Sequence, residues 1–270
     1  MTSKRGFIIG CIGAGAMGSA ILKRLASDGG ADDLIAFDID ENKTNALALS
    51  NGIRAAQSAQ ECARDADVVI VAVKPGTVPS VLALIKDVVR KNTVIVSIAA
   101  GVTLRELESI LGREKAIVRA MPNTPALVGE GMTVLSPNNS ENELLARVES
   151  IFSSLGRVMV LPETLMDAVT GLSGSGPAFV FTFISAMADA GVKLGIPRDK
   201  ALVLAAQTVL GAAKYALESG EDPALLRSRV ASPGGTTIEG IHVLERSGFS
   251  GIVMDAVEQA ALKSKKLGGG

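Results

Sequence analysis

Gly13-Ala14-Gly15-Ala16-Met17-Gly18 stands directly after the β-branched run at residues 6–12 and before a helical pattern. When such a motif joins a strand to a helix, its first glycine permits the tight turn and its second lets a pyrophosphate approach the backbone. The third glycine lets the helix pack on the sheet, and the helix N-terminus presents the positive end of its dipole. The motif therefore predicts a dinucleotide site rather than a glycine turn without a ligand. The expected coenzyme contacts here are Ile12, Gly13, Ala14, Gly15, Ala16 and Met17.

Strand and helix patterns alternate along the chain after this motif. Helical patterns of roughly 10–15 residues separate short apolar runs, as in βαβ units. The runs expected to form strands are residues 34–38, 53–54, 67–73, 94–98, 116–120, 131–135 and 157–161. We therefore expect an α/β fold whose N-terminal Rossmann-like domain, residues 1–162, has a mainly parallel sheet.

After about residue 162 the strand patterns stop, and glycines and prolines punctuate a series of helical patterns. Helices are expected at residues 167–172, 177–193, 198–218, 223–230, 236–247 and 251–266. The segment 202–215 is apolar on nearly all faces, which is typical of a helix buried in a core or against a second subunit. Residues 163–270 are therefore expected to form an all-helical second domain.

Composition argues against several functional classes. The 27 basic and 28 acidic side chains give a net charge of −1, so the chain has no electrostatic footprint for nucleic acid or an anionic membrane. The two cysteines are too few for a disulfide framework or a metal cluster, and Cys11 is expected to be a buried, inert thiol. No apolar stretch reaches the length of about 18 residues that a membrane span needs. We expect a cytoplasmic protein without a metal.

Asp38 ends the second predicted strand, about 20 residues beyond the glycine motif. A carboxylate at that place accepts hydrogen bonds from both ribose hydroxyls of NAD and repels the 2′-phosphate of NADP. Asp40 and Glu41 add negative charge, and Lys43 is the first cation after them. We therefore expect NADH to be preferred over NADPH. The alternative is that Asp38 only caps the following helix.

Further coenzyme contacts are expected where strands end, because ligands of open α/β sheets bind beyond the carboxyl ends of the strands. Lys74 would reach a phosphate or a ribose, or it is an exposed loop lysine. Small residues after the strand at 94–98 leave room for the nicotinamide, and an asparagine near 123 would hold its carboxamide. The expected contacts are Ala72, Val73, Lys74, Pro75, Ala99, Ala100 and Asn123.

The chain lacks the usual proton donors of alcohol and ketone dehydrogenases. Its one tyrosine, Tyr215, has Ser219 rather than a lysine four residues later, and its one histidine, His242, lies in an apolar helical pattern. A carbonyl substrate becomes an alkoxide and needs a strong proton partner. An imine nitrogen can arrive protonated, so an imine substrate fits this chain better.

A polar loop, Ser232-Pro233-Gly234-Gly235-Thr236-Thr237, interrupts the helical half of the chain. Its two glycines free the backbone to approach a ligand, and their N–H groups can point at an anion. Ser232, Thr236 and Thr237 add hydroxyls that donate or accept hydrogen bonds. The loop is the expected substrate site.

With these motifs the chain resembles the pyrroline-5-carboxylate reductases from the glycine motif to about Lys266. The most specific stretch is residues 230–238, Val-Ala-Ser-Pro-Gly-Gly-Thr-Thr-Ile, followed by His-Val-Leu-Glu at 242–245. Residues 167–178, Asp-Ala-Val-Thr-Gly-Leu-Ser-Gly-Ser-Gly-Pro-Ala, are also similar, as are the segments 72–75, 99–103 and 123–125.

The resemblance implies reduction of L-1-pyrroline-5-carboxylate, a cyclic imine, to L-proline, the last step of proline biosynthesis. It implies that Gly235 and Thr236 offer N–H groups to the substrate carboxylate, with Ser232 beside them. It also implies that Thr237 acts on the ring nitrogen as the catalytic residue and that Glu163 lies on the substrate side. The helical domain would form homodimers or larger homo-oligomers, with the site between subunits.

The chain departs from the family pattern at two places. The family commonly favours NADPH, whereas Asp38 and Asp40 stand after the second strand here. Family members also often have an asparagine in the loop near Ser58 and another just before the Ser-Pro-Gly-Gly loop. Here these regions read Gln57-Ser58-Ala59 and Arg227-Ser228-Arg229, and Arg229 would approach the coenzyme from the second domain. A reductase of another small imine or a 3-hydroxy acid remains an alternative, and so does a dinucleotide sensor without turnover.

Overall fold

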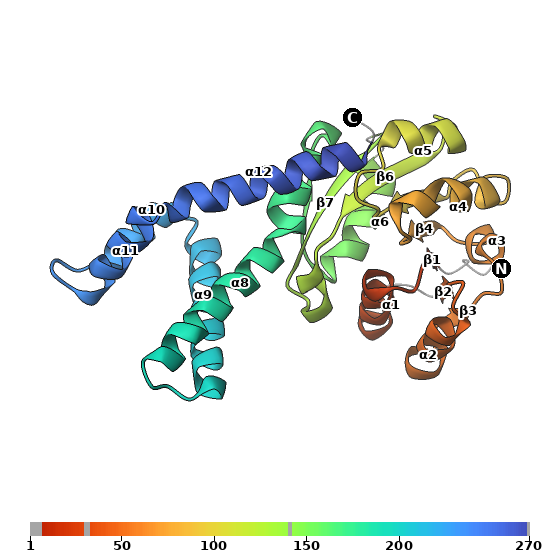
Figure 1. The fold of residues 1–270 in the computed structure, drawn as a ribbon. Coiled ribbons are helices and arrows are strands. Elements are labelled where there is room, and N and C mark those ends of the chain that lie inside the picture. Colours follow the sequence, from red (N-terminus) through yellow and green to blue (C-terminus); the bar gives the residue numbers. More distant parts are fainter. Residues whose placement is uncertain (1–6, 30–32, 140–141, 269–270) are drawn as a thin grey trace. The chain divides into compact units, whose positions relative to one another are not determined.

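The computed structural model describes residues 7–29, 33–139 and 142–268. The chain forms two compact units. The sheet unit comprises Met1–Gly174 together with Gln259–Gly270, and the helical unit comprises Ser175–Glu258. Figure 1 follows both along the chain.

The described part of the sheet unit holds one eight-stranded sheet with the order β3-β2-β1-β4-β5-β6-β7-β8. Its strands are β1 (Ile8–Ile12), β2 (Asp33–Phe37), β3 (Arg54–Ala55), β4 (Val68–Val71), β5 (Val94–Ser97), β6 (Ala116–Met121), β7 (Gly131–Pro137) and β8 (Gly156–Val160). Neighbouring strands are parallel except β6 and β7, which are antiparallel. The Rossmann-like fold and its mainly parallel sheet are thus confirmed.

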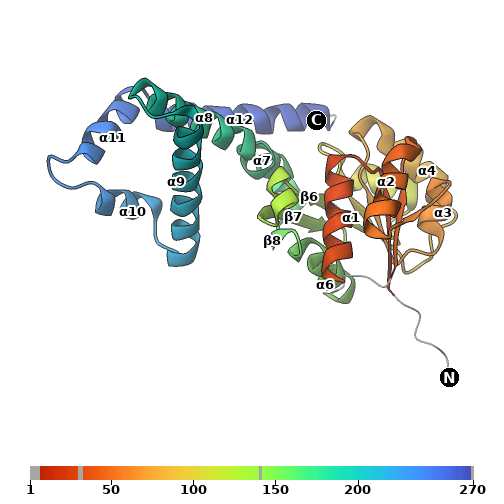
Figure 2. The ribbon, with the colours of Figure 1, turned by 90° about the horizontal axis from the view of Figure 1, so that it is seen from below.

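Helices cover both faces of the sheet (Figure 2). They are α1 (Ala16–Asp28), α2 (Glu41–Asn51), α3 (Ala59–Arg64), α4 (Val78–Ile85), α5 (Leu104–Leu111) and α6 (Asn142–Ser153). On β4, Val68 and Ile70 join the core under α1 and α6, whereas Val69 and Val71 join the core under α3, α4 and α5. Since successive side chains of a strand point to opposite faces, a strand buried on both faces is apolar throughout. This is why residues 68–73 read as one continuous apolar run.

Short helical turns follow the strands. They are η1 (Pro75–Thr77), η2 (Thr124–Val128), η3 (Glu163–Leu165), α7 (Met166–Val169) and the π-helical turn η4 (Thr170–Gly174). Met166 and Val169 pack with Val134 of β7 in a small core of their own. The compact units therefore divide after Gly174, whereas the division expected at residue 162 falls just after the last strand.

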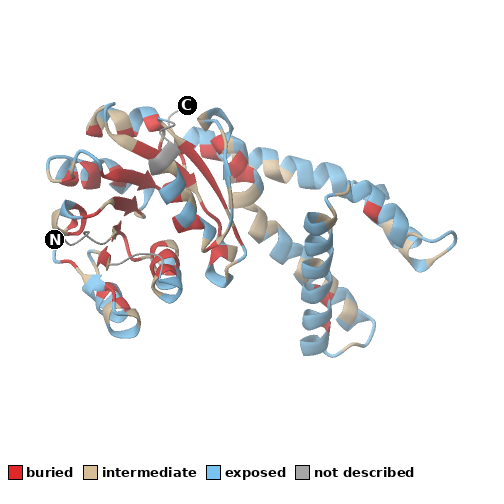
Figure 3. Ribbon diagram, turned by 180° about the vertical axis from the view of Figure 1, so that it is seen from behind, coloured by how far each residue is buried: buried red, intermediate tan, exposed pale blue. Residues whose placement is uncertain are grey.

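The helical unit contains α8 (Gly176–Lys193), α9 (Arg198–Ser219), α10 (Pro223–Val230), α11 (Thr236–Arg246) and the first half of α12 (Phe249–Leu267). Its buried cluster among the described residues consists of Ala188, Ala201 and Ala205, between α8 and α9, and Leu226 of α10 is buried apart from it. Most residues of this unit are exposed to solvent (Figure 3).

Large apolar side chains of α9 contact solvent in the single chain. Leu202, Val203 and Leu204 are 50%, 65% and 57% exposed. Of the two environments predicted for segment 202–215, burial in the core of the chain is therefore wrong, and burial against a second subunit remains. By length and composition alone, the helical run Glu163–Lys193 could also span a membrane.

Candidate active site

The glycine motif folds as a tight turn between β1 and α1. Gly13 has a φ of +105°, and a Cβ built on it would lie 2.4 Å from the carbonyl oxygen of Ala72. A Cβ on Gly18 would lie 2.0 Å from the carbonyl oxygen of Gly13. A Cβ on Gly15, by contrast, would meet no heavy atom within 4 Å. The first and third glycines therefore permit close packing within the protein, and the second leaves its surroundings open for a ligand.

The N-terminus of α1 is free to bind an anion. Gly15 is its N-cap and supplies no side-chain hydrogen bond. The first N–H groups of a helix have no partner inside it and attract negative charge. A pyrophosphate fits this place, since the open surroundings of Gly15 let it reach those N–H groups.

Asp38 follows β2 and faces the same turn. Its Oδ2 accepts a hydrogen bond from the N–H of Ala14 at 2.7 Å, and its Oδ1 accepts from the N–H of Asp40 at 2.9 Å. The ammonium of Lys43 lies 3.4 Å from Oδ1. Partial burial raises the pKa of Asp38, but these two N–H groups and Lys43 outweigh it, so that the pKa lies below its ordinary value. Asp38 is therefore ionised at neutral pH. It contacts the glycine turn itself, whereas Asp40 caps α2.

The ends of β1, β4 and β5 lie side by side, since β4 pairs with both other strands in parallel. The N–H of Ala72 donates to the carbonyl of Ile12 at 2.8 Å, and the N–H of Ile98 donates to that of Val71 at 3.1 Å. The structure thus brings the glycine turn and the predicted segments 72–75 and 99–100 to one edge of the sheet. Lys74 is exposed there.

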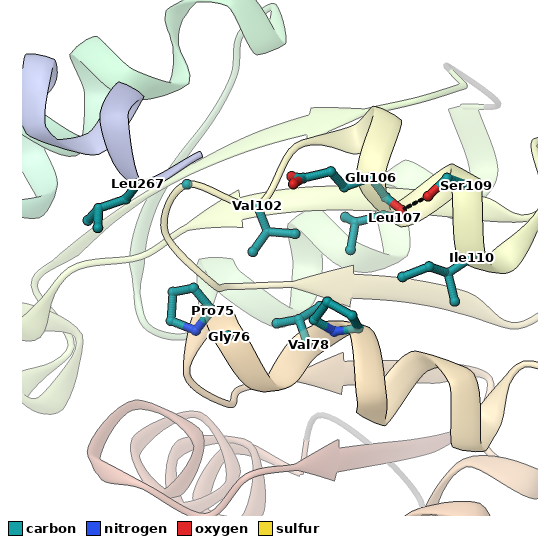
Figure 4. A pocket seen from close by; sticks show the side chains of 11 residues that line it. Pro75, Gly76, Val78, Val102, Glu106, Leu107, Ser109, Ile110 and Leu267 are labelled. Carbon is teal, nitrogen blue, oxygen red and sulfur yellow. Dashed lines mark hydrogen bonds between the residues drawn. The ribbon is translucent and has the colours of Figure 1, made fainter. Parts of the chain in front are cut away.

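A hollow of about 370 Å³ lies at this edge between η1, α4 and α5 (Figure 4). Pro75 and Gly76 line it on one side, Val102 and Leu107 on the other. Leu267, in the last turn of α12, lies at one end. The hollow therefore lies between two of the loops expected to border the coenzyme.

Two predicted ligand residues make hydrogen bonds within the protein. The side-chain amide of Asn123 donates to the carbonyl of Ser173 at 2.9 Å and accepts from the N–H of Met132 at 2.9 Å. Glu163 Oε1 accepts from the N–H of Leu104 at 2.6 Å and pairs with Arg119 at 3.2 Å. Asn123 thereby connects the η2 turn to η4, and Glu163 connects the start of α5 to β6.

The polar loop precedes α11 in the helical unit. Gly234 has a φ of +66°, and the N–H of Gly235 donates to the carbonyl of Ser232 at 3.0 Å, which closes a turn. Gly235 is the N-cap of α11 and supplies no side-chain cap. Since the N–H of Gly235 is engaged in the turn, the free groups are the N–H of Thr236 and those that follow it in the first helical turn. The arrangement therefore offers N–H groups that can bind an anion, with hydroxyls beside them.

Arg229 lies on α10, shortly before this loop. Its guanidinium pairs with the carboxylate of Glu221 through two hydrogen bonds, one of them 2.7 Å long. This hydrogen-bonded carboxylate raises the pKa of Arg229. Glu221 carried no signal in the sequence, because it lies between helices and belongs to no motif.

Both cysteines are buried, as predicted for Cys11. Both lie in the sheet unit with no exposed surface. Burial raises the pKa of Cys11 well above its ordinary value and that of Cys62 to about 12. No group of three or more metal-ligating side chains occurs among the described residues.

Both the sheet unit and the helical unit match known protein families. A family model described as pyrroline-5-carboxylate reductase dimerisation matches residues 163–267, and one described as NADP oxidoreductase coenzyme F420-dependent matches residues 8–101. The pyrroline-5-carboxylate reductase of Escherichia coli K12 is 48% identical over 262 residues, which are 96% of this chain and 97% of that protein.

Solved structures of full-length relatives share the fold. The pyrroline-5-carboxylate reductase of Coxiella burnetii superposes with a TM-score of 0.90 at 35% identity, over 97% of this chain and 98% of that one. The pyrroline carboxylate reductase of Plasmodium falciparum, solved with NADP bound, gives 0.88 at 35% identity with the same coverage.

Proposed function

The chain belongs to the pyrroline-5-carboxylate reductase family and is such an enzyme. From this we propose how its residues reduce the cyclic imine L-1-pyrroline-5-carboxylate to L-proline. When bound, the reduced nicotinamide supplies the hydride that reaches the C=N carbon. The uncapped N-terminus of α11 carries the proposal, because it is an anion site flanked by hydroxyls.

The substrate carboxylate is held by the start of α11. The N–H of Thr236 and its successors donate to it, while the turn closed by Ser232 and Gly235 keeps those groups in place. A Cβ on Gly235 would lie 2.3 Å from Ser232 Oγ. Glycine is therefore needed for the serine hydroxyl to lie over the turn, beside the bound carboxylate.

Thr237 orients the ring nitrogen. Its hydroxyl lies in the first turn of α11, and no hydrogen bond to it occurs among the described residues. Hydride addition to a protonated imine neutralises a charge, so a positioned hydroxyl suffices where a carbonyl would need an acid. Glu163 remains a proposed substrate-side acid, since its Oε1 is engaged and no partner to Oε2 occurs among the described residues.

We propose that the coenzyme binds on the glycine turn, and that NADH is preferred. The ionised carboxylate of Asp38 is only 10% exposed and lies at the turn, where a ribose hydroxyl can donate to it. Lys43, which would otherwise attract a 2′-phosphate, already pairs with Asp38 and Asp40. The NADP bound to the Plasmodium falciparum relative is the contrasting case.

The match to a dimerisation model supports a homo-oligomer built through the helical unit. A second subunit would cover the exposed leucines of α9 and the exposed apolar residues of α8, such as Val180 and Phe181. Dimerisation therefore accounts for apolar helices that the single chain leaves in solvent.

The test is the absorbance decay of NADH and of NADPH with pyrroline-5-carboxylate as the only acceptor. Rapid oxidation with NADH preferred supports both the reaction and the role of Asp38. Turnover with NADPH preferred keeps the reaction and refutes the role of Asp38. Binding of coenzyme without turnover would instead favour a dinucleotide sensor.

A further inference from the structure

One loop at the coenzyme edge, Ile98–Thr103, joins β5 to α5 and contains the predicted contacts Ala99 and Ala100. Its far end is anchored by Glu163, whose Oε1 accepts from the N–H of Leu104, the first residue of α5. Arg119 of β6 holds that carboxylate, and the guanidinium side chain is 5% exposed. An ion pair with a buried guanidinium therefore fixes the point where the loop becomes a helix.

The last turn of α12 reaches the same loop from a distant part of the sequence. Ser264 is 3% exposed and its Oγ donates to Asp167 Oδ1 at 2.7 Å. The same Asp167 oxygen lies 3.9 Å from Arg119 Nη2. The buried Arg119 thus faces two carboxylates: that of Glu163, which accepts a hydrogen bond from the end of the loop, and that of Asp167, which accepts one from Ser264 of α12.

The backbone of that turn contacts the middle of the loop. Gly101 has a φ of +80°, and a Cβ on it would lie 3.1 Å from the nitrogen of Gly268. A Cβ on Gly268 would lie 2.4 Å from the carbonyl oxygen of Gly101. Two main chains therefore meet directly, with Leu267 lining the hollow beside them (Figure 4).

We infer that Ser264 and Gly268 are positioning residues for hydride transfer: together with Arg119 they hold the Ile98–Thr103 loop in the shape against which the nicotinamide lies. The inference rests on the proposed function, which places the nicotinamide at Ala99 and Ala100. Neither residue touches the reacting atoms. They act through Asp167 and Gly101, which join the end of α12 to the loop.

The physical reason is the distance dependence of hydride transfer. A misplacement of about 1 Å in a reacting group, caused from outside the site, can cost on the order of 100-fold in rate. Gly101 lacks a side chain to pack, so its position is set by what covers it. An added methyl group at Gly268 must push the two backbones apart, and loss of the Ser264 hydroxyl frees Asp167.

The experiment compares Ser264→Ala and Gly268→Ala with the control variants Lys265→Ala and Lys266→Ala, which change exposed residues on the same turn. Amide hydrogen exchange of residues 98–107 is measured first, without coenzyme. We expect the two positioning variants to exchange faster there than wild type, while the lysine variants do not. This readout does not depend on turnover.

Steady-state kinetics then use coenzyme deuterated at the transferred position. We expect kcat to fall about tenfold in the positioning variants, with a larger isotope effect and less than a twofold change in the substrate KM. The melting temperature should stay near that of wild type for Ser264→Ala, which loses only one hydroxyl. Wild-type amide exchange and wild-type kcat in both variants would overturn the inference. A loss of kcat no larger than the fraction of unfolded enzyme in the sample would also overturn it.

Failure of the proposed function is recognised separately. Wild-type enzyme that does not reduce pyrroline-5-carboxylate would refute the reaction whatever the variants do. Wild-type turnover with unaffected variants would leave the reaction intact and remove Ser264 and Gly268 from it.

Discussion

Substitution by alanine should lower the stability of the protein at Gly18 but weaken coenzyme binding at Gly15. A Cβ on Gly18 would lie 2.0 Å from the carbonyl oxygen of Gly13, where ordinary contact needs about 3.4 Å or more. The turn and the helix must therefore separate by more than 1 Å, at a cost of about 1–3 kcal/mol typical of overpacking. For a chain of this size that lowers Tm by roughly 2–4 °C per kcal/mol.

Gly15→Ala should leave folding unchanged and impair binding. Its Cβ meets nothing within 4 Å, and its φ of −71° suits any residue. The new methyl group occupies space that the pyrophosphate needs, so we expect at least a tenfold rise in coenzyme Kd, about 1.4 kcal/mol.

Thermal unfolding of the coenzyme-free variants and a fluorescence titration with NADH and NADPH separate the two effects. Gly18→Ala should lose stability, whereas Gly15→Ala should melt like wild type and bind weakly. Wild-type affinity in Gly15→Ala would refute the placement of the pyrophosphate. A wild-type melting temperature in Gly18→Ala would refute the packing argument.

Four further predictions concern other parts of the chain. Thr237→Ala should lower kcat/KM about 30-fold, or about 2 kcal/mol in barrier, while Thr237→Ser keeps most activity; equal rates for all three would remove the hydroxyl from the mechanism. Asp38→Asn should shift the ratio of kcat/KM values toward NADPH, and an unchanged ratio would show that Asp38 does not select the coenzyme. The pKa of Asp38 is lowered in the folded protein, so its ionised form adds stability above the unfolded pKa of about 3.9, and this stability is lost as the pH falls through the folded pKa. The free energies of unfolding of wild type and Asp38→Asn, measured with denaturant, should therefore converge in acid. A difference that stays constant with pH would contradict this. Iodoacetamide should label Cys11 and Cys62 only after denaturation, and rapid labelling of the native protein would show that the thiols are reachable.

Much of the sheet unit could be predicted because its signals are local. The buried strand β4 reads as an unbroken apolar run, and the glycine motif specifies a turn whose close contacts with Ala72 are dictated by the absence of side chains. The exposed leucines of α9 carried the same apolar signal as a core helix. Sequence alone leaves both environments open, because a partner subunit and a core bury the same side chains.

Contacts between distant segments could not be predicted. Arg119, Asp167 and Ser264 come from β6, α7 and α12, and no spacing in the sequence connects them. Likewise, the motif around Gly235 indicated an anion site but not that its own N–H closes the turn with Ser232. Such assignments depend on three-dimensional proximity, which only the folded chain supplies.

The path of α12 through both units makes the helical unit an insertion in the chain of the sheet unit rather than an appendage to it. A chain shortened after Gly174 would keep every described strand but lose Ser264 and Gly268. A chimera that exchanges helical units between relatives needs two junctions, and the second, at Glu258, falls inside a continuous helix. There the phase of the helix matters, because one added residue rotates all that follows by about 100° and turns Ser264 away from Asp167. Such chimeras should therefore tolerate changes in residue identity at exposed positions of α12 before Ser264, but not changes in its length.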